Sequence, residues 1–168
     1  SNQGSSGRCW MFAGLNVIRH KMIEDFKLAN SFEFSENYLL FWDKLERINY
    51  YLNVYQELQE KNIELKSQLF QHVLNNPLED GGQWQMFVNL VNKYGLVPKT
   101  IFPETKHSSN TRGLNMVLTR KLRDYCKEIL EQKLDRKKAM EEVYTILVKF
   151  LGRPPNKFTW EYYDKENK

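Results

Sequence analysis

The sequence is poor in the residues from which many metal sites, disulfide frameworks and membrane anchors are built. Its 168 residues include only two cysteines and three histidines, which disfavours both a disulfide framework and a histidine- or cysteine-rich metal centre. No run of about 20 apolar residues occurs, so the pattern predicts no transmembrane helix. The acidic pairs 24–25 and 79–80 have no clustered histidine or cysteine beside them. We therefore expect no metal ion, no other cofactor and no membrane association.

The sequence also lacks a strong excess of one charge. Its 25 Lys and Arg against 21 Asp and Glu give a net charge of +4. Positive charge is concentrated between residues 112 and 138, where such a helix could bind nucleic-acid phosphates. The same residues also suit a solvated helix face with ion pairs four residues apart. No zinc-finger or ribonucleoprotein motif accompanies them, so nucleic-acid binding stays an alternative.

The residues that are present suit a folded, mostly helical domain. Hydrophobic residues make up 41% and aromatic residues 14%, which is enough for a buried core. Apolar positions three and four residues apart predict helices over 9–28, over 35–47 with a continuation to about 74, over 84–94, and as a pair over 114–151. Gly95 and the Gly152–Pro155 segment predict helix ends. The aromatic run 158–163 predicts the start of a strand.

The most informative segment is Gln3-Gly-Ser-Ser-Gly-Arg-Cys9-Trp-Met-Phe12. Its glycines predict a loop that leads into a helix at Cys9, so the cysteine falls in the first helical turn. Unpaired backbone N–H groups and the positive end of the helix dipole favour an anion there, and Arg8 adds a positive charge. Because the thiolate is the reactive form of cysteine, we predict Cys9 as a nucleophile with Gln3 and backbone amides as oxyanion donors. The predicted buried face of this helix is Trp10, Phe12, Ala13, Val17 and Ile18.

A cysteine nucleophile needs a general base, and the histidines of this chain suit that role poorly. His20 follows Cys9 on the same helix, roughly 16 Å along the axis at about 1.5 Å per residue, which is too far to reach the thiol. His72 lies on a helix flank, as a solvated histidine does. His107 lies in a polar loop with Asn110 nearby and would be the first substitute to test. The second cysteine, Cys126, is expected to be a small core residue.

Several blocks of the sequence resemble one family. Gln3 followed by Cys9-Trp10 resembles the active-site signature of papain-like cysteine peptidases, and blocks 34–39, 80–84 and 94–98 resemble its following segments. The amino-acid sequences of blocks 5–10, 41–44, 76–84 and 154–162 narrow the resemblance to the bleomycin hydrolase and aminopeptidase C branch. Together the blocks extend from residue 2 to about residue 165. The resemblance therefore covers essentially the whole chain.

The resemblance implies an α+β papain-like cysteine peptidase fold. This chain would be mainly its helical lobe, one domain over 1–168, without the β-rich lobe. Helical insertions are expected over 43–76 and 105–151, and the start of a connection to the second lobe over 156–168. The family's catalytic histidine and asparagine lie in a His-Ala-like strand and an Asn-Ser-Trp-Gly-like segment, and neither occurs in this sequence. We therefore interpret the chain as the N-terminal part of a longer enzyme.

The resemblance also implies what the longer enzyme does. It would be a cytoplasmic cysteine-type aminopeptidase that hydrolyses peptides through an acyl-enzyme on Cys9. Trp10, Asp80, Gly81 and Gly82 would bind substrate, with the glycines pairing their backbone with an extended peptide. Family members assemble as hexameric rings, so a homohexamer is implied. The alternatives are a catalytically inactive homologue or fragment that uses its long helices for interaction, and nucleic-acid binding through residues 112–138.

Overall fold

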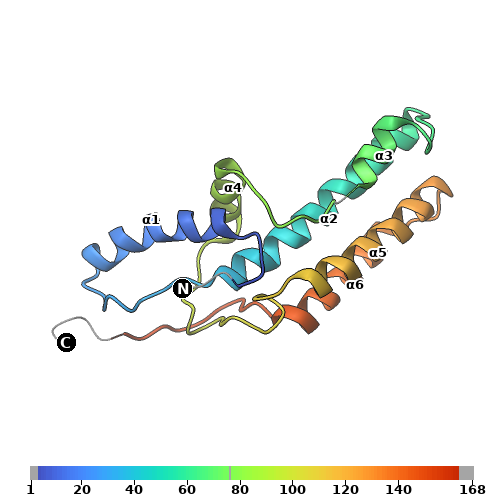
Figure 1. Ribbon diagram of the computed structural model, residues 1–168. Helices are drawn as coiled ribbons and strands as arrows, with labels where there is room; N and C mark the ends of the chain where they lie inside the picture. The colour runs from blue at the N-terminus through green and yellow to red at the C-terminus, as the bar shows by residue number, and fades with distance from the viewer. Residues whose placement is uncertain (1–3, 76, 163–168) are drawn as a thin grey trace.

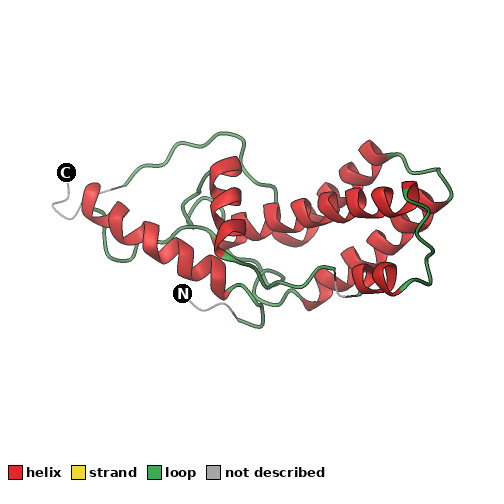
Figure 2. Ribbon diagram, turned by 90° about the horizontal axis from the view of Figure 1, so that it is seen from above, coloured by secondary structure: helices red, strands yellow, loops and turns green. Residues whose placement is uncertain are grey.

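The computed structural model describes residues 4–75 and 77–162, and its helices are labelled in Figure 1. They are α1 (Cys9–Asp25), α2 (Glu36–Glu60), α3 (Gln68–Leu74), α4 (Trp84–Tyr94), α5 (Arg112–Leu130) and α6 (Arg136–Leu151). Over the described ranges, β-pairing is limited to isolated bridges that join Ser5 to Asn110 and Phe34 to Pro98. Figure 2 accordingly shows helices joined by loops. The predicted mainly helical character is confirmed.

The helices begin and end at residues that favour those positions. The side chain of Ser35 accepts a hydrogen bond from the backbone N–H of Tyr38 at 3.0 Å and so caps the start of α2, as Ser at an N-cap is expected to do. Gly95 ends α4 with φ of 73° and Gly152 ends α6 with φ of 94°, backbone conformations that favour glycine. The predicted long helical stretch divides into α2 and α3 because the chain turns at Asn62, where φ is 52°.

α2 is the central helix of the molecule. It packs against α5, α6, α4 and α1, and Figure 1 shows the α5–α6 pair running alongside it. Its apolar face includes Ile48, Leu52 and Tyr55, all fully buried. The rings of Tyr55 and Phe70 stack with centroids 6.0 Å apart, which folds α3 back against α2. Since burying a large apolar side chain stabilises a fold by about 1.5–3 kcal/mol, these contacts hold the long helices together.

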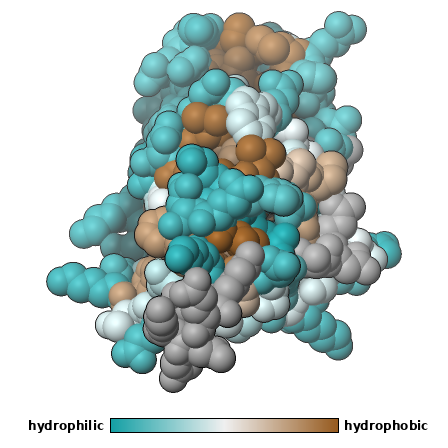
Figure 3. Space-filling view, turned by 90° about the vertical axis from the view of Figure 1, so that its left-hand side faces the viewer, coloured by the Kyte–Doolittle hydropathy of each residue, from teal (hydrophilic) through white to brown (hydrophobic). Residues whose placement is uncertain are grey.

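The buried face of α1 agrees only in part with the predicted one: Trp10 and Ile18 pack against the core as predicted. The residues that it buries are Met11, Gly14 and Leu15. Ala13 is exposed and Val17 keeps 65% of its surface accessible, so the prediction was wrong at these two positions. Apolar residues occur around most of this helix, and spacing alone then does not specify the buried side. Gly14 sets the contact, because a Cβ there would lie 2.6 Å from the ring of Phe87 on α4. Figure 3 views the end where α1 terminates and shows apolar patches among hydrophilic side chains.

The segment after α6 differs from its prediction. Residues 158–162 are irregular, and residue 163, the last of the predicted strand, lies outside the described residues. The ring of Trp160 packs on Phe32, with centroids 5.2 Å apart, and on Tyr162 at 4.8 Å. A strand needs a neighbouring strand for its backbone hydrogen bonds, and these side-chain contacts do not provide one.

Over residues 4–75 and 77–162, no helix combines the length and apolar character needed to cross a membrane.

The two predicted insertions are largely helical. Most of the predicted 43–76 insertion consists of the later part of α2 together with α3, and most of the predicted 105–151 insertion consists of α5 and α6. That these segments are insertions stays a prediction.

Candidate active site

Cys9 lies in the first turn of α1 as a free, exposed thiol. The backbone N–H groups of Met11 and Phe12 donate to the carbonyl of Arg8, at 2.9 and 3.1 Å. Within the part of the chain that the structure describes, the backbone N–H groups of Cys9 and Trp10 donate no hydrogen bond. Two donors therefore lie beside the thiol, where they can receive an anion. Gln3, the predicted side-chain donor, lies outside the described residues.

Arg8 has a different role from the predicted one. Its side chain is fully buried and forms a bidentate pair with Glu104, with Nη1–Oε1 and Nη2–Oε2 distances of 3.0 and 2.9 Å. Its Nε donates to Ser6 Oγ at 2.8 Å, and its guanidinium lies 5.2 Å from the ring centre of Phe12. The carboxylate neutralises the positive charge that the sequence placed next to the thiol. Arg8 instead anchors the loop that carries Cys9.

The loop before Cys9 is held by residues 104–111. The backbone N–H of Ser5 donates to the carbonyl oxygen of Ser109 at 2.9 Å. Gly4 has φ of 63°, and a Cβ on it would lie 2.4 Å from that same carbonyl oxygen. Ser108 is fully buried and donates to Glu104, the partner of Arg8. A segment that the sequence indicated only as a polar loop therefore fixes the backbone of the candidate nucleophile.

Asp80 lies at the centre of a network beside the same loop. Its Oδ1 accepts from Lys44 Nζ at 2.6 Å and from Asn115 Nδ2 at 2.9 Å. Its Oδ2 accepts from the Thr111 hydroxyl and from the backbone N–H of Gly7, the latter at 3.3 Å. Burial alone would raise the pKa of Asp80, but the Lys44 ammonium and the hydrogen bonds from Lys44, Thr111 and Asn115 outweigh it and lower the pKa to about 2. Asp80 is therefore ionised at neutral pH.

Lys44 and Arg47 of α2 hold the segment that carries the glycine pair. Lys44 is fully buried and donates also to the carbonyl of Leu78 at 2.9 Å. Arg47 donates from Nη2 to the carbonyl of Gly81 at 2.5 Å and from Nε to Asp43 at 2.9 Å. Sequence reasoning did not identify either basic residue as part of the site. The available signal was a pair of basic residues close to the apolar run Leu39–Trp42, but their partners in the segment 78–81 lie more than 30 residues away.

Trp10 joins the Cys9 helix to the glycine pair. Its Nε1 donates to the backbone carbonyl of Asp80 at 2.7 Å, and a Cβ on Gly82 would lie 2.5 Å from its indole ring. Gly81 is exposed. In the described ranges no hydrogen bond occupies the backbone N–H or carbonyl of Gly82, which leaves both groups for an extended peptide. Substrate binding by Trp10, Asp80, Gly81 and Gly82 stays a prediction.

The described residues provide no histidine partner for the thiol. No hydrogen bond in that part of the chain joins Cys9 to a histidine, and both His20 and His72 are exposed. His107 is exposed too, and its ring packs on Phe150 with centroids 4.7 Å apart. Among the described residues, the site therefore combines a thiol and candidate oxyanion donors with no histidine hydrogen-bonded to that thiol.

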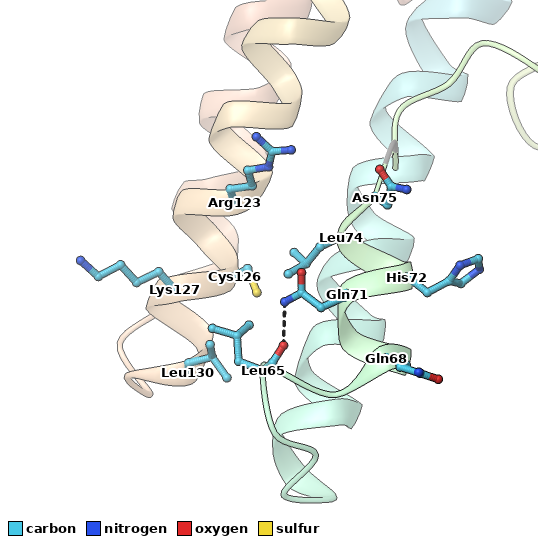
Figure 4. A pocket seen from close by; sticks show the side chains of 10 residues that line it. All are labelled: Leu65, Gln68, Gln71, His72, Leu74, Asn75, Arg123, Cys126, Lys127 and Leu130. Atoms are coloured by element: carbon cyan, nitrogen blue, oxygen red, sulfur yellow. Dashed lines mark hydrogen bonds between the residues drawn. The ribbon is translucent and has the colours of Figure 1, made fainter.

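Cys126 differs sharply from Cys9. It is buried, and burial raises the pKa of its thiol to about 11, so its prediction as a core residue is confirmed. It borders a groove of about 840 Å³ between α3 and α5. Figure 4 shows this groove, where Gln71 donates to the carbonyl of Leu65 at 2.8 Å. Figure 1 places α3 at the opposite end of α2 from α1. The groove is therefore separate from the Cys9 site.

The fold and the site together define a class. An exposed cysteine in the first turn of a helix, beside a glycine pair of which Gly82 has unpaired backbone groups, agrees with the arrangement that the resemblance implies for the helical lobe of a papain-like cysteine peptidase. The model of the Peptidase C1-like family matches residues 1–168, and the chain belongs to this family.

Individual relatives narrow the match. Bleomycin hydrolase from Gallus gallus is 43% identical, with 99% of this chain and 38% of the relative covered. Aminopeptidase C from Listeria innocua is 44% identical, with 99% and 39% covered. The crystal structure of PepW from Lactobacillus rhamnosis has a TM-score of 0.92 at 41% identity and covers 100% of this chain and 39% of that one. The chain thus corresponds to the N-terminal 38–39% or so of these relatives. The resemblance to the bleomycin hydrolase and aminopeptidase C branch is confirmed.

Proposed function

We propose that the protein to which this chain belongs is a cysteine-type aminopeptidase similar to bleomycin hydrolase, and that Cys9 is its nucleophile. The observation that carries the proposal is the exposed thiol of Cys9 beside the unbonded backbone N–H groups of Cys9 and Trp10. Relatives named bleomycin hydrolase and aminopeptidase C support this reaction class.

In the proposed reaction, Cys9 Sγ attacks the carbonyl carbon of the scissile peptide bond, and the carbonyl oxygen becomes an oxyanion. The backbone N–H of Cys9 and the side-chain amide of Gln3 donate to that oxygen. The carbon–nitrogen bond then breaks, the leaving amine takes up a proton, and a thioester remains on Cys9. Water hydrolyses the thioester to a carboxylic acid and restores the thiol. A histidine outside these 168 residues, oriented by an asparagine, would transfer the protons.

The glycine pair supports the binding of a peptide in an extended conformation. The backbone N–H and carbonyl of Gly82 would pair with the backbone of the substrate, as an added strand does. Gly81 would have a lesser part, since its carbonyl already accepts a hydrogen bond from Arg47. In keeping with the resemblance, we further expect a homohexameric ring in the cytoplasm, and sedimentation of the full-length protein tests the assembly.

The alternatives receive less support. The family match favours neither a catalytically inactive homologue or fragment that serves for interaction nor nucleic-acid binding. Arg136, inside the basic segment, donates to Gln56 and Asn49 of α2, and Lys121 pairs with Glu142 of α6, so part of this charge is used within the fold. Nucleic-acid binding would require an affinity that falls steeply with added salt, and undetectable binding would eliminate it.

The decisive experiment compares the two cysteines in the full-length enzyme. Cys9→Ala should lower kcat/KM for an aminoacyl coumarin amide by at least about 1,000-fold, because the acyl-enzyme cannot form. Cys126→Ala is the matched control and should stay within about threefold, because that thiol lies in the core away from the site. Activity that survives Cys9→Ala would refute the proposal.

A thiol-directed epoxide distinguishes an active peptidase from an inactive homologue. It should label Cys9 rapidly in the full-length protein and leave Cys126 unmodified, as measured by peptide mass spectrometry. Slow and equal labelling of the two cysteines would indicate an inactive homologue.

A further inference from the structure

We propose that the buried Lys44–Asp80 ion pair is a positioning device that keeps the peptide-binding backbone of Gly82 in register with Cys9. In this role Asp80 is a positioning residue and not a group that contacts the substrate. The inference rests on the proposed function, because register matters only if a peptide bound at the glycine pair is attacked by Cys9.

The first link joins Asp80 to both sides of the nucleophile. Its Oδ2 accepts from the backbone N–H of Gly7 at 3.3 Å, and its backbone carbonyl accepts from Trp10 Nε1 at 2.7 Å. Gly7 and Trp10 flank the Arg8-Cys9 pair in sequence. The approach is close, since a Cβ on Gly7 would lie 3.1 Å from Asp80 Cβ. A displacement of Asp80 would therefore move the backbone on either side of the thiol.

The second link joins Asp80 to the peptide-binding backbone. Asp80 directly precedes Gly81 and Gly82 in the chain, so its side-chain contacts fix where the glycine pair begins. Lys44 holds both the Asp80 carboxylate and the carbonyl of Leu78, at 2.6 and 2.9 Å. One lysine of α2 therefore fixes the segment at two points before the glycine pair.

Because the Lys44–Asp80 pair is buried, its main contribution is to the orientation of the surrounding segments and not to the stability of the fold. The side chains of Lys44 and Asp80 are 0% and 9% exposed. A buried ion pair contributes little net stability, because desolvation of both charges offsets their attraction, while removal of one partner leaves an uncompensated charge. An apolar pair would fill the same space, but it could neither accept hydrogen bonds from Gly7, Thr111 and Asn115 nor donate one to Leu78. The charged pair orients the segment in a way that packing alone would not.

The test uses Lys44→Met in the full-length enzyme, with Arg136→Met as the matched control. Arg136 also holds α2, through Gln56 and Asn49, but no described contact joins it to residues 78–82. Lys44→Met should lower kcat for an aminoacyl coumarin amide by at least about tenfold, because misplacing a bound substrate by an ångström is costly. Alkylation of Cys9 by iodoacetamide, a reagent too small to need the glycine pair, should change by less than about twofold. The control should leave both rates unchanged.

Hydrogen exchange provides a readout that does not depend on turnover. In Lys44→Met, amide exchange should accelerate both in peptides that cover residues 4–10 and in peptides that cover residues 78–83. In the Arg136→Met control, exchange should accelerate in neither set of peptides. If Lys44→Met fails to fold, Asp80→Asn serves for the same measurements, because an amide cannot accept from all the donors that the carboxylate satisfies. Faster exchange at 78–83 alone, unchanged kcat, or a parallel loss of iodoacetamide reactivity would each overturn the proposal. Activity that survives Cys9→Ala would instead refute the proposed function, and the exchange data would still decide the coupling.

Discussion

Several hydrogen-bond donors from different parts of the chain converge on the carboxylate of Asp80. Lys44 comes from α2, Asn115 from α5, Thr111 from the residue before α5, and Gly7 from the loop before α1. A carboxylate can accept hydrogen bonds from several donors at once, and a hydrogen bond from a charged donor is stronger than one from a neutral donor. This residue therefore joins segments that are far apart in the sequence.

The titration of Asp80 gives a prediction about acid stability. Its pKa is about 2 in the folded protein, against an ordinary value of 3.8. Because the folded value is the lower one, its contribution to stability is complete above the ordinary pKa and is lost as the pH falls toward 2. Thermal unfolding followed by circular dichroism between pH 2 and pH 5 should show a steeper fall of Tm in the wild type than in Asp80→Asn. Glu161→Gln, at an exposed carboxylate, should follow the wild type. Equal slopes for wild type and Asp80→Asn would contradict this assignment.

The two glycines of the pair should respond differently to alanine. A Cβ on Gly82 would overlap the indole of Trp10, whereas a Cβ on Gly81 would meet nothing within 4 Å. Gly82→Ala should therefore lower the free energy of unfolding by about 1–3 kcal/mol, the usual cost of overpacking. Gly81→Ala is the control and should change it by less than about 0.5 kcal/mol. Urea unfolding measures both variants, and equal losses would show that Trp10 does not restrict Gly82.

At the scale of elements, the start of α1 depends on a contact between two loops. Residues 4–8 lie against residues 104–111, with Arg8 and Glu104 as the central pair and Ser5 bonded to Ser109. The second loop leads directly into α5, so the long helical pair 112–151 and the candidate nucleophile share one anchoring point. Substitutions within residues 104–111 should therefore affect the candidate site even though they lie outside it.

Removal of Arg8 tests this anchoring. Arg8→Met should lower the free energy of unfolding by about 3 kcal/mol or more, because it leaves Glu104 without its buried partner. Lys21→Met, which breaks an exposed pair with Asp25 on the same helix, should have little effect, since exposed pairs contribute little. Urea unfolding checks both variants. A small loss for Arg8→Met would mean that Ser108 and water replace the guanidinium as partners of Glu104.

At the scale of the whole molecule, the chain provides one side of the proposed catalytic site. The thiol, the unbonded N–H groups and the glycine pair lie together near the start of α1. Among the described residues, no histidine is hydrogen-bonded to that thiol. The chain spans about 38% of the length of Gallus gallus bleomycin hydrolase. We propose that the general base lies in the part of the protein that corresponds to the rest of that relative.

Turnover by the isolated chain tests this division of the site. The purified 168-residue chain should hydrolyse an aminoacyl coumarin amide at no more than the rate of its own Cys9→Ala variant, because the thiol lacks a general base. The full-length enzyme at the same molar concentration serves as the positive control. Robust hydrolysis by the isolated chain would contradict the expectation, and His107 would then be the first residue to replace.

The sequence by itself determined the local features, because they depend on residues close together along the chain. Helix positions follow from apolar spacing, Ser35 and Gly95 mark helix ends through their own hydrogen bonds and φ angles, and the glycines before Cys9 place it in a first helical turn. The family resemblance could be recognised from the sequence for the same reason, because each of its motifs consists of a few neighbouring residues.

Only the tertiary structure decided which distant groups meet. It placed Arg8 against Glu104 and Lys44 against Asp80, and it turned Val17 of an evenly apolar helix toward the outside. A buried charge requires a partner, and the sequence showed several charges in apolar surroundings without saying which would pair. The identity of each partner depends on how the helices pack, which is set by the summed contacts of the whole core and by no single motif.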